Sequence, residues 1–195
     1  MERKDLSKSR LILILGGTRS GKSRFALERG ETLGEEKIFI ATARPSDAEM
    51  ARRIERHRRE RPEAWKTLEE PLHLADRLRS MEGKAEVAVI DCLTLWLSNL
   101  LTAVGEDEEK ILGEIDRLVS VARSVNFSIV AVSNEVGLGV VPTDHSLSRL
   151  FRDLSGLLHQ RWAAEADEVY WMMAGIAVPI KRKQDEKAAV GHRPD

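Results

Sequence analysis

The fold of this chain is decided by one stretch near its start, Gly16-Gly17-Thr18-Arg19-Ser20-Gly21-Lys22-Ser23. It contains a glycine, four unrestricted positions and then Gly-Lys-Ser, which is the spacing of a phosphate-binding loop. The five residues before it, 11–15, are all apolar, as in a strand buried on both faces of a parallel sheet. Residues 22–33 follow with a helical pattern. The sequence therefore predicts a strand, a loop that binds nucleotide phosphates, and a helix.

The residue types in this loop suit that chemistry. Glycines let successive backbone N–H groups turn inward around phosphate oxygens, and the start of a helix adds the positive end of its dipole. Lys22 is expected to neutralise the β- and γ-phosphates, and the Ser23 hydroxyl to bind Mg²⁺. The alternative is a glycine-rich turn without a ligand, which the apolar strand in front of the loop disfavours.

Composition limits the classes of function. A chain of 195 residues with 42% hydrophobic and 32% charged residues is predicted to be a soluble globular domain. Its 31 basic and 32 acidic residues nearly cancel, so no overall field attracts nucleic acid, and we expect no nucleic-acid partner. Any anion site must be local.

Cysteine usage and hydropathy indicate the compartment. The single cysteine, Cys92, excludes an internal disulfide, and its apolar neighbours predict a buried, reduced thiol in a cytoplasmic protein. We expect no signal peptide, because the charged residues 1–10 lead into only five apolar residues. We expect no membrane span either, because the longest apolar stretch, residues 169–180, is short and is interrupted by Gly175 and Pro179.

The remaining chain alternates apolar strands with longer helical stretches, which is typical of an α/β domain. We predict strands at residues 11–15, 37–41, 86–90, 128–132, 168–173 and 177–181. We predict helices at residues 22–33, 47–60, 72–81, 93–103, 107–125 and 146–166. The last two strands flank Ala174-Gly175 and are expected to form a hairpin. Residues 11–181 are predicted to be a single catalytic domain, with flexible ends at residues 1–10 and 182–195.

An arginine-rich helix carries a candidate nucleophile. Residues 46–49, Ser-Asp-Ala-Glu, have the pattern of a capping box that opens a helix. Helical spacing places His57 on the same side as Met50 and Ile54, with arginines around it, so we expect it to face inward. A neutral imidazole among guanidinium groups can attack a phosphorus atom. A histidine on a solvated basic face is the alternative, and the residues alone favour that alternative.

Several polar side chains follow predicted strands. Asp91 ends one strand and is a candidate Mg²⁺ partner, and the alternative is that it caps the next helix. Asn134 and Glu135 follow the next strand and are expected to contact substrate, unless they only form a polar loop. Glu69 and its neighbour Glu70 precede a proline, and from the residues alone they indicate a helix start.

Taken together, these residues resemble one family: the bifunctional adenosylcobinamide kinase and adenosylcobinamide-phosphate guanylyltransferase of cobalamin biosynthesis. The resemblance covers residues 11–181. Besides the phosphate loop, the matching segments are Ile40-Ala41-Thr42, Glu49-Met50-Ala51-Arg52-Arg53-Ile54, His57, Arg61-Pro62, Trp65, Asp91-Cys92-Leu93-Thr94, Asn99-Leu100-Leu101, Asn134-Glu135-Val136-Gly137-Leu138-Gly139-Val140-Val141-Pro142, Phe151-Arg152-Asp153 and Ala166-Asp167-Glu168-Val169. The phosphate loop is common to many enzymes, whereas the His57 segment and the Asn-Glu-Val-Gly loop are far more specific.

The resemblance implies a RecA-like sheet, a homotrimer and two reactions. ATP or GTP phosphorylates adenosylcobinamide, and GTP then donates GMP to adenosylcobinamide phosphate. The guanylylated histidine of the family falls on His57. Beyond the phosphate loop, the implied guanine nucleotide contacts are Thr42, Ala43, Arg44, Arg58, Arg59, Glu60, Arg61, Glu69 and Asp91.

Two other interpretations of the sequence also include the phosphate-binding loop. One is a kinase of another small alcohol with a single activity, in which His57 is only structural. The other is a switch protein that binds nucleotide without turning it over and changes conformation instead. Turnover that depends on cobinamide would separate the enzyme from the switch.

Overall fold

The computed structural model describes residues 9–45, 47–59, 61–139 and 146–182, and its centre is a single seven-stranded sheet. The strand order is β3-β2-β4-β5-β1-β6-β7. Every neighbouring pair is parallel except β6 and β7, which are antiparallel. The strands are β1 (Leu11–Gly16), β2 (Lys37–Ala41), β3 (Lys66–Glu69), β4 (Val87–Asp91), β5 (Ser128–Asn134), β6 (Glu168–Met173) and β7 (Ile176–Arg182).

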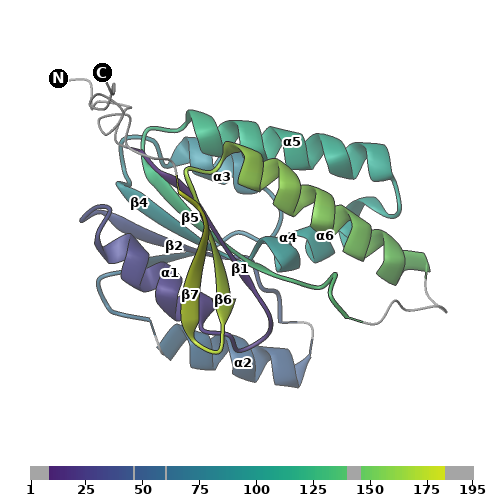
Figure 1. Ribbon diagram of the computed structural model, residues 1–195, viewed down its shortest axis with the longest axis horizontal. Coiled ribbons are helices and arrows are strands. Elements are labelled where there is room, and N and C mark those ends of the chain that lie inside the picture. Colours follow the sequence, from purple (N-terminus) through teal and green to yellow (C-terminus); the bar gives the residue numbers. More distant parts are fainter. Residues whose placement is uncertain (1–8, 46, 60, 140–145, 183–195) are drawn as a thin grey trace, which may run out of the picture.

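Helices cover both faces of the sheet (Figure 1). They are α1 (Lys22–Glu31), α2 (Ala48–Arg59), α3 (Leu74–Ser80), α4 (Leu93–Val104), α5 (Glu108–Ser124) and α6 (Ser146–Glu165). Helices α3 to α6 lie on one face and α1 on the other, while α2 lies at the edge of the molecule. In the part of the chain that the structure describes, no helix combines the length and the apolar character that crossing a membrane requires.

The two-sided cover explains the continuous apolar runs. Along β1, Leu11 and Leu13 pack into the core cluster on the α3–α6 face, whereas Ile12 and Ile14 pack into the cluster on the α1 face. Successive side chains of a strand point to opposite faces, so a strand covered on both sides must be apolar at every position. The predicted α/β fold is confirmed at this level.

The six predicted strands and six predicted helices all exist, with ends within two residues of those observed. The predicted hairpin is confirmed, and its turn is formed by Ala174 and Gly175, both with positive φ. Strand β3 was not predicted from the sequence; within the described residues it is an edge strand that pairs with β2 alone. Glu69 therefore ends a strand and does not start a helix. Glu70 does serve the next helix, because its carboxylate accepts the N–H of His73 at 2.8 Å.

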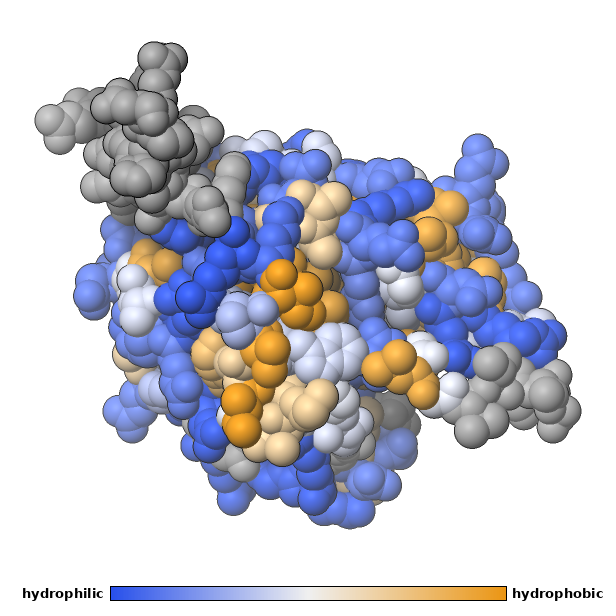
Figure 2. Space-filling model, viewed as in Figure 1, coloured by the Kyte–Doolittle hydropathy of each residue, from blue (hydrophilic) through white to orange (hydrophobic). Residues whose placement is uncertain are grey.

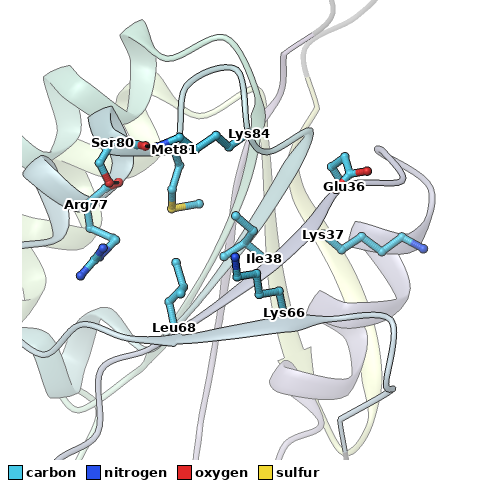
Figure 3. A pocket seen from close by; sticks show the side chains of 9 residues that line it. All are labelled: Glu36, Lys37, Ile38, Lys66, Leu68, Arg77, Ser80, Met81 and Lys84. Atoms are coloured by element: carbon cyan, nitrogen blue, oxygen red, sulfur yellow. Dashed lines mark hydrogen bonds between the residues drawn. The ribbon is translucent and has the colours of Figure 1, made fainter.

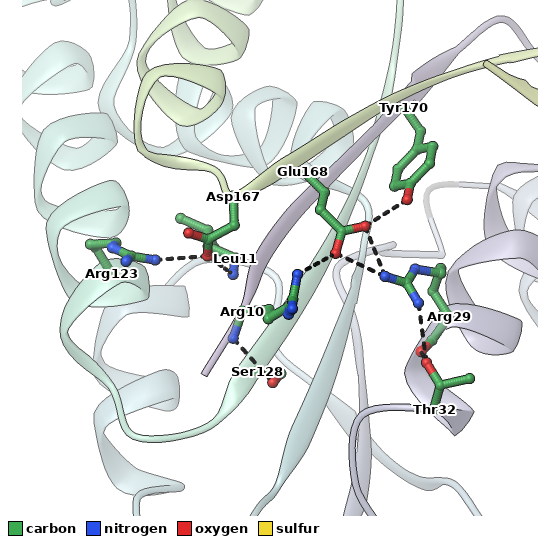
Figure 4. A network of polar contacts seen from close by, with 9 residues as sticks. All are labelled: Arg10, Leu11, Arg29, Thr32, Arg123, Ser128, Asp167, Glu168 and Tyr170. Carbon is green, nitrogen blue, oxygen red and sulfur yellow. Dashed lines mark hydrogen bonds and ion pairs between the residues drawn. The ribbon is translucent and has the colours of Figure 1, made fainter. Parts of the chain in front are cut away.

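Two acidic side chains at the start of β6 connect the start of β1 to the last turns of α1 and α5 (Figure 4). Asp167 accepts the Leu11 N–H and an Arg123 N–H on one oxygen, both at 2.9 Å. Glu168 accepts hydrogen bonds from Arg10 at 3.1 Å, Arg29 at 2.8 Å and the Tyr170 hydroxyl at 2.6 Å. The folded part therefore includes Arg10 and, at the other end, Arg182 of β7, although both were assigned to flexible ends. Residues 1–8 and 183–195 lie outside the described residues.

Candidate nucleotide site

The phosphate loop closes tightly between β1 and α1. Gly16 has φ 149°, and a Cβ at this position would lie 2.5 Å from the carbonyl oxygen of Met172 on β6. Gly21 caps α1 in the left-handed region, with φ 94°. Only glycine fits both requirements without strain, so the first and last glycines of the motif are fixed by the backbone.

The loop folds around the ammonium group of Lys22. Its Nζ donates a hydrogen bond to the Gly17 carbonyl at 2.5 Å and lies 3.4 Å from the Ser20 hydroxyl. Burial lowers the pKa of Lys22, while the nearby Cys92 and Asp91 groups act in the opposite direction. The buried amine therefore lies within electrostatic reach of the partly buried Asp91, beside loop N–H groups that can meet a phosphate.

The start of α1 is open to an anion. Within α1, which the structure describes in full, the first turn carries no acidic residue. Lys22 and the half-exposed Ser23 occupy that turn. Unpaired N–H groups and the positive end of the helix dipole favour a phosphate at this position.

The carboxyl ends of three neighbouring strands line up at the edge of the sheet where the loop follows β1. Ala41 of β2 is in register with Glu69 of β3 on one side and with Asp91 of β4 on the other. Thr42 follows β2 and is fully buried, and its hydroxyl bonds both the carbonyl and the N–H of Cys92 at 2.8 Å. Thr42 therefore holds the chain next to Asp91, and a direct contact between its side chain and nucleotide stays a prediction.

Arg61 brings a positive charge to these strand ends. Its guanidinium lies over the ring of Phe39, 3.9 Å from the ring centre, and donates to the Thr67 hydroxyl at 3.3 Å. Burial lowers the pKa of Arg61, whereas Asp91 and Glu69 favour its charged form. Arg61 therefore lies within electrostatic reach of Asp91 and Glu69, and all three are predicted nucleotide contacts.

Asn134 and Glu135 lie directly beside the loop. Strand β5 lies between β4 and β1, and Asn134 is in register with Gly16. The Glu135 N–H donates to the Gly16 carbonyl at 3.0 Å, and the Asn134 N–H donates to the Thr94 hydroxyl at 2.6 Å. The two candidate substrate contacts are thus placed at the edge of the phosphate site.

The expected inward orientation of His57 is wrong. His57 is exposed in the last turn of α2, and among the side chains of α2 that the structure describes none is fully buried. Met50 and Ile54 are only partly covered, so the apolar stripe that holds α2 ends one turn before His57. Its neighbours Arg58 and Arg59 are also exposed.

The other sites predicted near α2 differ in accessibility. Ala43 is partly buried and Arg44 is exposed, both in the connection from β2 to α2. Glu60 and Ser46 lie outside the described residues. The helix start expected at Ser46 is nevertheless supported by its neighbour, because Asp47 Oδ1 accepts the Met50 N–H at 2.7 Å.

The donor set suits a magnesium ion that is shared with phosphates. Among the described residues, no three His, Cys, Asp or Glu side chains lie together in a group that could hold a metal. Mg²⁺ usually takes one or two protein oxygens and completes its shell with phosphate and water. Ser23, next to Lys22 in the first turn of α1, and Asp91, at the end of β4, supply oxygens of the kind that this pattern needs.

Two surface hollows lie at the opposite edge of the sheet and do not join this site. One is lined by the starts of β2 and β3 and by α3, and Figure 3 shows Leu68 and Met81 pointing into it. Of the cations that line it, Arg77 pairs with Glu70 at 3.2 Å and Lys37 pairs with Glu31. The other surrounds the Glu168 network described above. Neither hollow changes the location of the candidate site.

Two further parts of the chain, which were not predicted from the sequence, support the site. The turn of the β6–β7 hairpin contacts the loop, since the Gly175 N–H donates to the Ser20 carbonyl at 3.1 Å. His159 of α6 is buried and hydrogen-bonded to Ser133 at 2.8 Å. Helical spacing does place His159 on the buried face with Leu158 and Trp162, but spacing cannot identify its partner.

The fold and this loop define a P-loop nucleotide-binding protein. Its backbone is similar to a solved ATPase domain, with a TM-score of 0.50 at 14% identity, covering 91% of this chain and 78% of that chain. It is also similar to the type III secretion ATPase EscN of enteropathogenic E. coli, with a TM-score of 0.52 at 13% identity, covering 86% and 43%. The predicted RecA-like class is confirmed.

Sequence comparison identifies the family. Residues 12–180 match the family model described as cobinamide kinase / cobinamide phosphate guanyltransferase. The chain is 46% identical over 169 residues to the bifunctional adenosylcobalamin biosynthesis protein CobP of Pseudomonas aeruginosa, covering 87% of this chain and 96% of that protein. It is 40% identical over 185 residues to CobU of Escherichia coli, covering 88% and 99%. The chain belongs to this family, and the resemblance seen in its sequence is confirmed.

Proposed function

We propose that this protein phosphorylates adenosylcobinamide with ATP or GTP and then transfers GMP from GTP to the new phosphate, giving adenosylcobinamide-GDP and pyrophosphate. The names of its relatives describe bifunctional enzymes of adenosylcobalamin biosynthesis. The observation that carries the proposal is the loop closed around Lys22, with Asp91, Glu69 and Arg61 at the adjacent strand ends. This is one nucleotide site that serves two reactions.

In the kinase reaction the chain binds and orients the triphosphate. The loop N–H groups and Lys22 hold the β- and γ-phosphates, and Ser23 and Asp91 are the residues that would hold Mg²⁺. Bound there, Mg²⁺ would offset negative charge on the phosphates. Arg61 and Glu69 lie farther along the strand ends and are proposed to contact the rest of the nucleotide.

In the second reaction we assign His57 as the nucleophile. Its imidazole attacks the α-phosphorus of GTP, the bond to the bridging oxygen breaks, and pyrophosphate leaves with the electron pair. A phosphate oxygen of the corrinoid substrate then displaces the histidine. The exposure of His57 and the shallow packing of α2 support this role, because a weakly anchored helix can bring the ring to the loop.

We also propose that the protein is a cytoplasmic homotrimer. Four large apolar side chains on the β6–β7 hairpin, Met173, Ile176, Val178 and Ile180, are between 46% and 67% exposed. In Figure 2 the hairpin region shows a continuous apolar surface. Such a patch on an edge strand favours burial against another copy of the chain. Sedimentation equilibrium tests the assembly, and a monomer at micromolar concentration would contradict it.

The proposed activity is tested by following the corrinoid. Protein, Mg²⁺, GTP and adenosylcobinamide are incubated, and the corrinoid products are separated and weighed by mass spectrometry. We expect adenosylcobinamide phosphate first and adenosylcobinamide-GDP later. Phosphate without GDP ester would favour the kinase with a single activity. GTP binding without any corrinoid product would favour the nucleotide-dependent switch.

A further inference from the structure

A buried chain of polar side chains lies behind the end of β5. The hydroxyls of Thr94 and Ser133 are 2.9 Å apart, and the Ser133 hydroxyl lies 2.8 Å from Nε2 of His159. These three residues are 5%, 0% and 7% exposed, respectively. The second ring nitrogen of His159, Nδ1, faces the carboxylate of Glu135 at 3.7 Å, an electrostatic contact longer than a hydrogen bond. The chain therefore has one accessible end, which is Glu135.

The distances favour one direction for the hydrogen bonds in this chain. The Thr94 hydroxyl oxygen accepts the Asn134 N–H at 2.6 Å. Its own proton has two acceptors, the Ser133 hydroxyl at 2.9 Å and the Asn134 carbonyl at 3.4 Å, and the shorter contact favours Ser133. The Ser133 hydroxyl then donates to Nε2 of His159, which leaves the ring proton on Nδ1. The reverse direction would turn a nitrogen lone pair toward the Glu135 carboxylate, which is electrostatically unfavourable.

The ring is neutral in this arrangement. Burial lowers the pKa of His159, and the Glu135 carboxylate only partly opposes that effect. A neutral ring with its N–H toward Glu135 orients the carboxylate without neutralising it. Glu135 therefore stays available to accept a proton from another group.

The position of Glu135 is fixed on both sides. Its backbone N–H donates to the carbonyl of Gly16, the first residue of the phosphate loop, at 3.0 Å. One carboxylate oxygen accepts the Gly137 N–H at 2.5 Å, and the other faces His159. The Gly137 carbonyl is in turn held by Arg152 at 2.6 Å. A partly exposed carboxylate is thus held at the edge of the site where the γ-phosphate binds.

We propose that Glu135 is the base that accepts the proton of the substrate hydroxyl in the kinase reaction, and that His159 is the residue that positions it. The inference rests on the kinase activity proposed above. The O–H bond breaks as its oxygen bonds to the γ-phosphorus, and the proton goes to the Glu135 carboxylate. The bond from the γ-phosphorus to the bridging oxygen breaks, and its electron pair leaves with the nucleoside diphosphate. Glu135 then releases the proton to water.

The second reaction has no need for this base. The acceptor in GMP transfer is a phosphate, and the second pKa of such a group is near 6, so above neutral pH its oxygens carry no proton that must be removed. Removing the carboxylate of Glu135 is therefore expected to separate the two activities. A purely structural role for Glu135 would reduce both together.

The decisive variant is Glu135→Gln, which keeps the shape and an oxygen for the Gly137 N–H. We expect the kinase kcat to fall by about 10²- to 10⁴-fold, the usual contribution of a general base, with the nucleotide KM unchanged. GMP transfer to supplied adenosylcobinamide phosphate is expected to stay at the wild-type rate. Glu165→Gln, at an exposed glutamate at the end of α6, is the matched control and should change neither reaction.

Two substitutions of His159 test the positioning role. In His159→Asn the amide nitrogen takes about the place of Nδ1 and can still donate toward Glu135, whereas in His159→Gln the amide reaches Ser133 instead. We expect the Asn variant to keep the higher kinase kcat, and both variants to keep GMP transfer.

Three results would contradict the proposed roles of Glu135 and His159. Wild-type kinase activity in Glu135→Gln, or an equal loss of both activities, would overturn the inference. A Gln variant of His159 that equals or exceeds the Asn variant would remove the positioning role. A wild-type protein without kinase activity would instead refute the proposed function, and the inference with it.

Discussion

Substitution of Gly16 by alanine tests whether the backbone requires glycine at the start of the loop. The new methyl group would lie 2.5 Å from the Met172 carbonyl and 2.9 Å from the Ser20 hydroxyl. The carbonyl belongs to β6, which is paired with β1 at this position, so it cannot move freely. The φ of 149° adds strain for any residue with a side chain.

The two effects are estimated separately. Backbone strain in a glycine-only region costs about 1–3 kcal/mol. Overpacking against a fixed backbone costs about 1–3 kcal/mol. A total loss of about 2–6 kcal/mol corresponds to a fall in Tm of about 4–24 °C in a chain of this size. We also expect weaker binding of GTP, because the displaced loop no longer encloses Lys22.

The assay is thermal unfolding with and without GTP. Gly17→Ala is the matched control, because a Cβ there meets nothing within 4 Å and its φ is not positive. Its Tm without nucleotide should stay close to that of the wild type. A Gly16→Ala protein with the wild-type Tm would refute the reasoning from this geometry.

Three further predictions follow from the packing. Arg61→Lys removes the planar guanidinium that stacks on Phe39. We expect calorimetry to show weaker GTP binding, with Tm little changed. An unaltered affinity for GTP would contradict a nucleotide contact by Arg61. Burial tends to raise the pKa of Glu168, but hydrogen bonds from Tyr170 and its arginine partners hold it below the ordinary 4.5. Its stabilisation is therefore complete above 4.5 and is lost below it, as the pH falls through the lowered pKa of the folded state. Glu168→Gln should weaken the dependence of Tm on pH below 4.5, and an unchanged slope would argue against this role. Gly113→Ala, in the exposed middle of α5 with open space around the new Cβ, should raise stability by about 0.5–1 kcal/mol, and a decrease in Tm would contradict this.

The strands and the phosphate loop could be predicted from the sequence because their signals are local. A strand covered on both faces must be apolar throughout, as in β1, and the phosphate loop has glycine at position 21, where φ is 94°. Strand β3 gave no such signal. It has only four residues, lies at the edge, and starts and ends with exposed charged side chains, Lys66 and Glu69.

The site was predicted only in part because its assembly is not local. Helical spacing placed His57 on the same side of α2 as Met50 and Ile54. Spacing does not show where the surface that supports this side ends, and the last turn of α2, which carries His57, extends past that surface. The contact between Ser133 and His159 joins residues 26 positions apart on different elements. Only the folded chain shows that such polar side chains share one buried network.

The central claim, one loop serving two reactions through a covalent histidine, is tested most directly with GTP labelled at the α-phosphate. Wild-type protein, His57→Ala and the control His73→Ala, at an exposed histidine before α3, are incubated with Mg²⁺ and labelled GTP without corrinoid. The account predicts an acid-labile, alkali-stable adduct of the mass of GMP on the wild type and the control, absent from His57→Ala. A folded wild-type protein that binds GTP without forming the adduct, or an adduct that persists in His57→Ala, would contradict it.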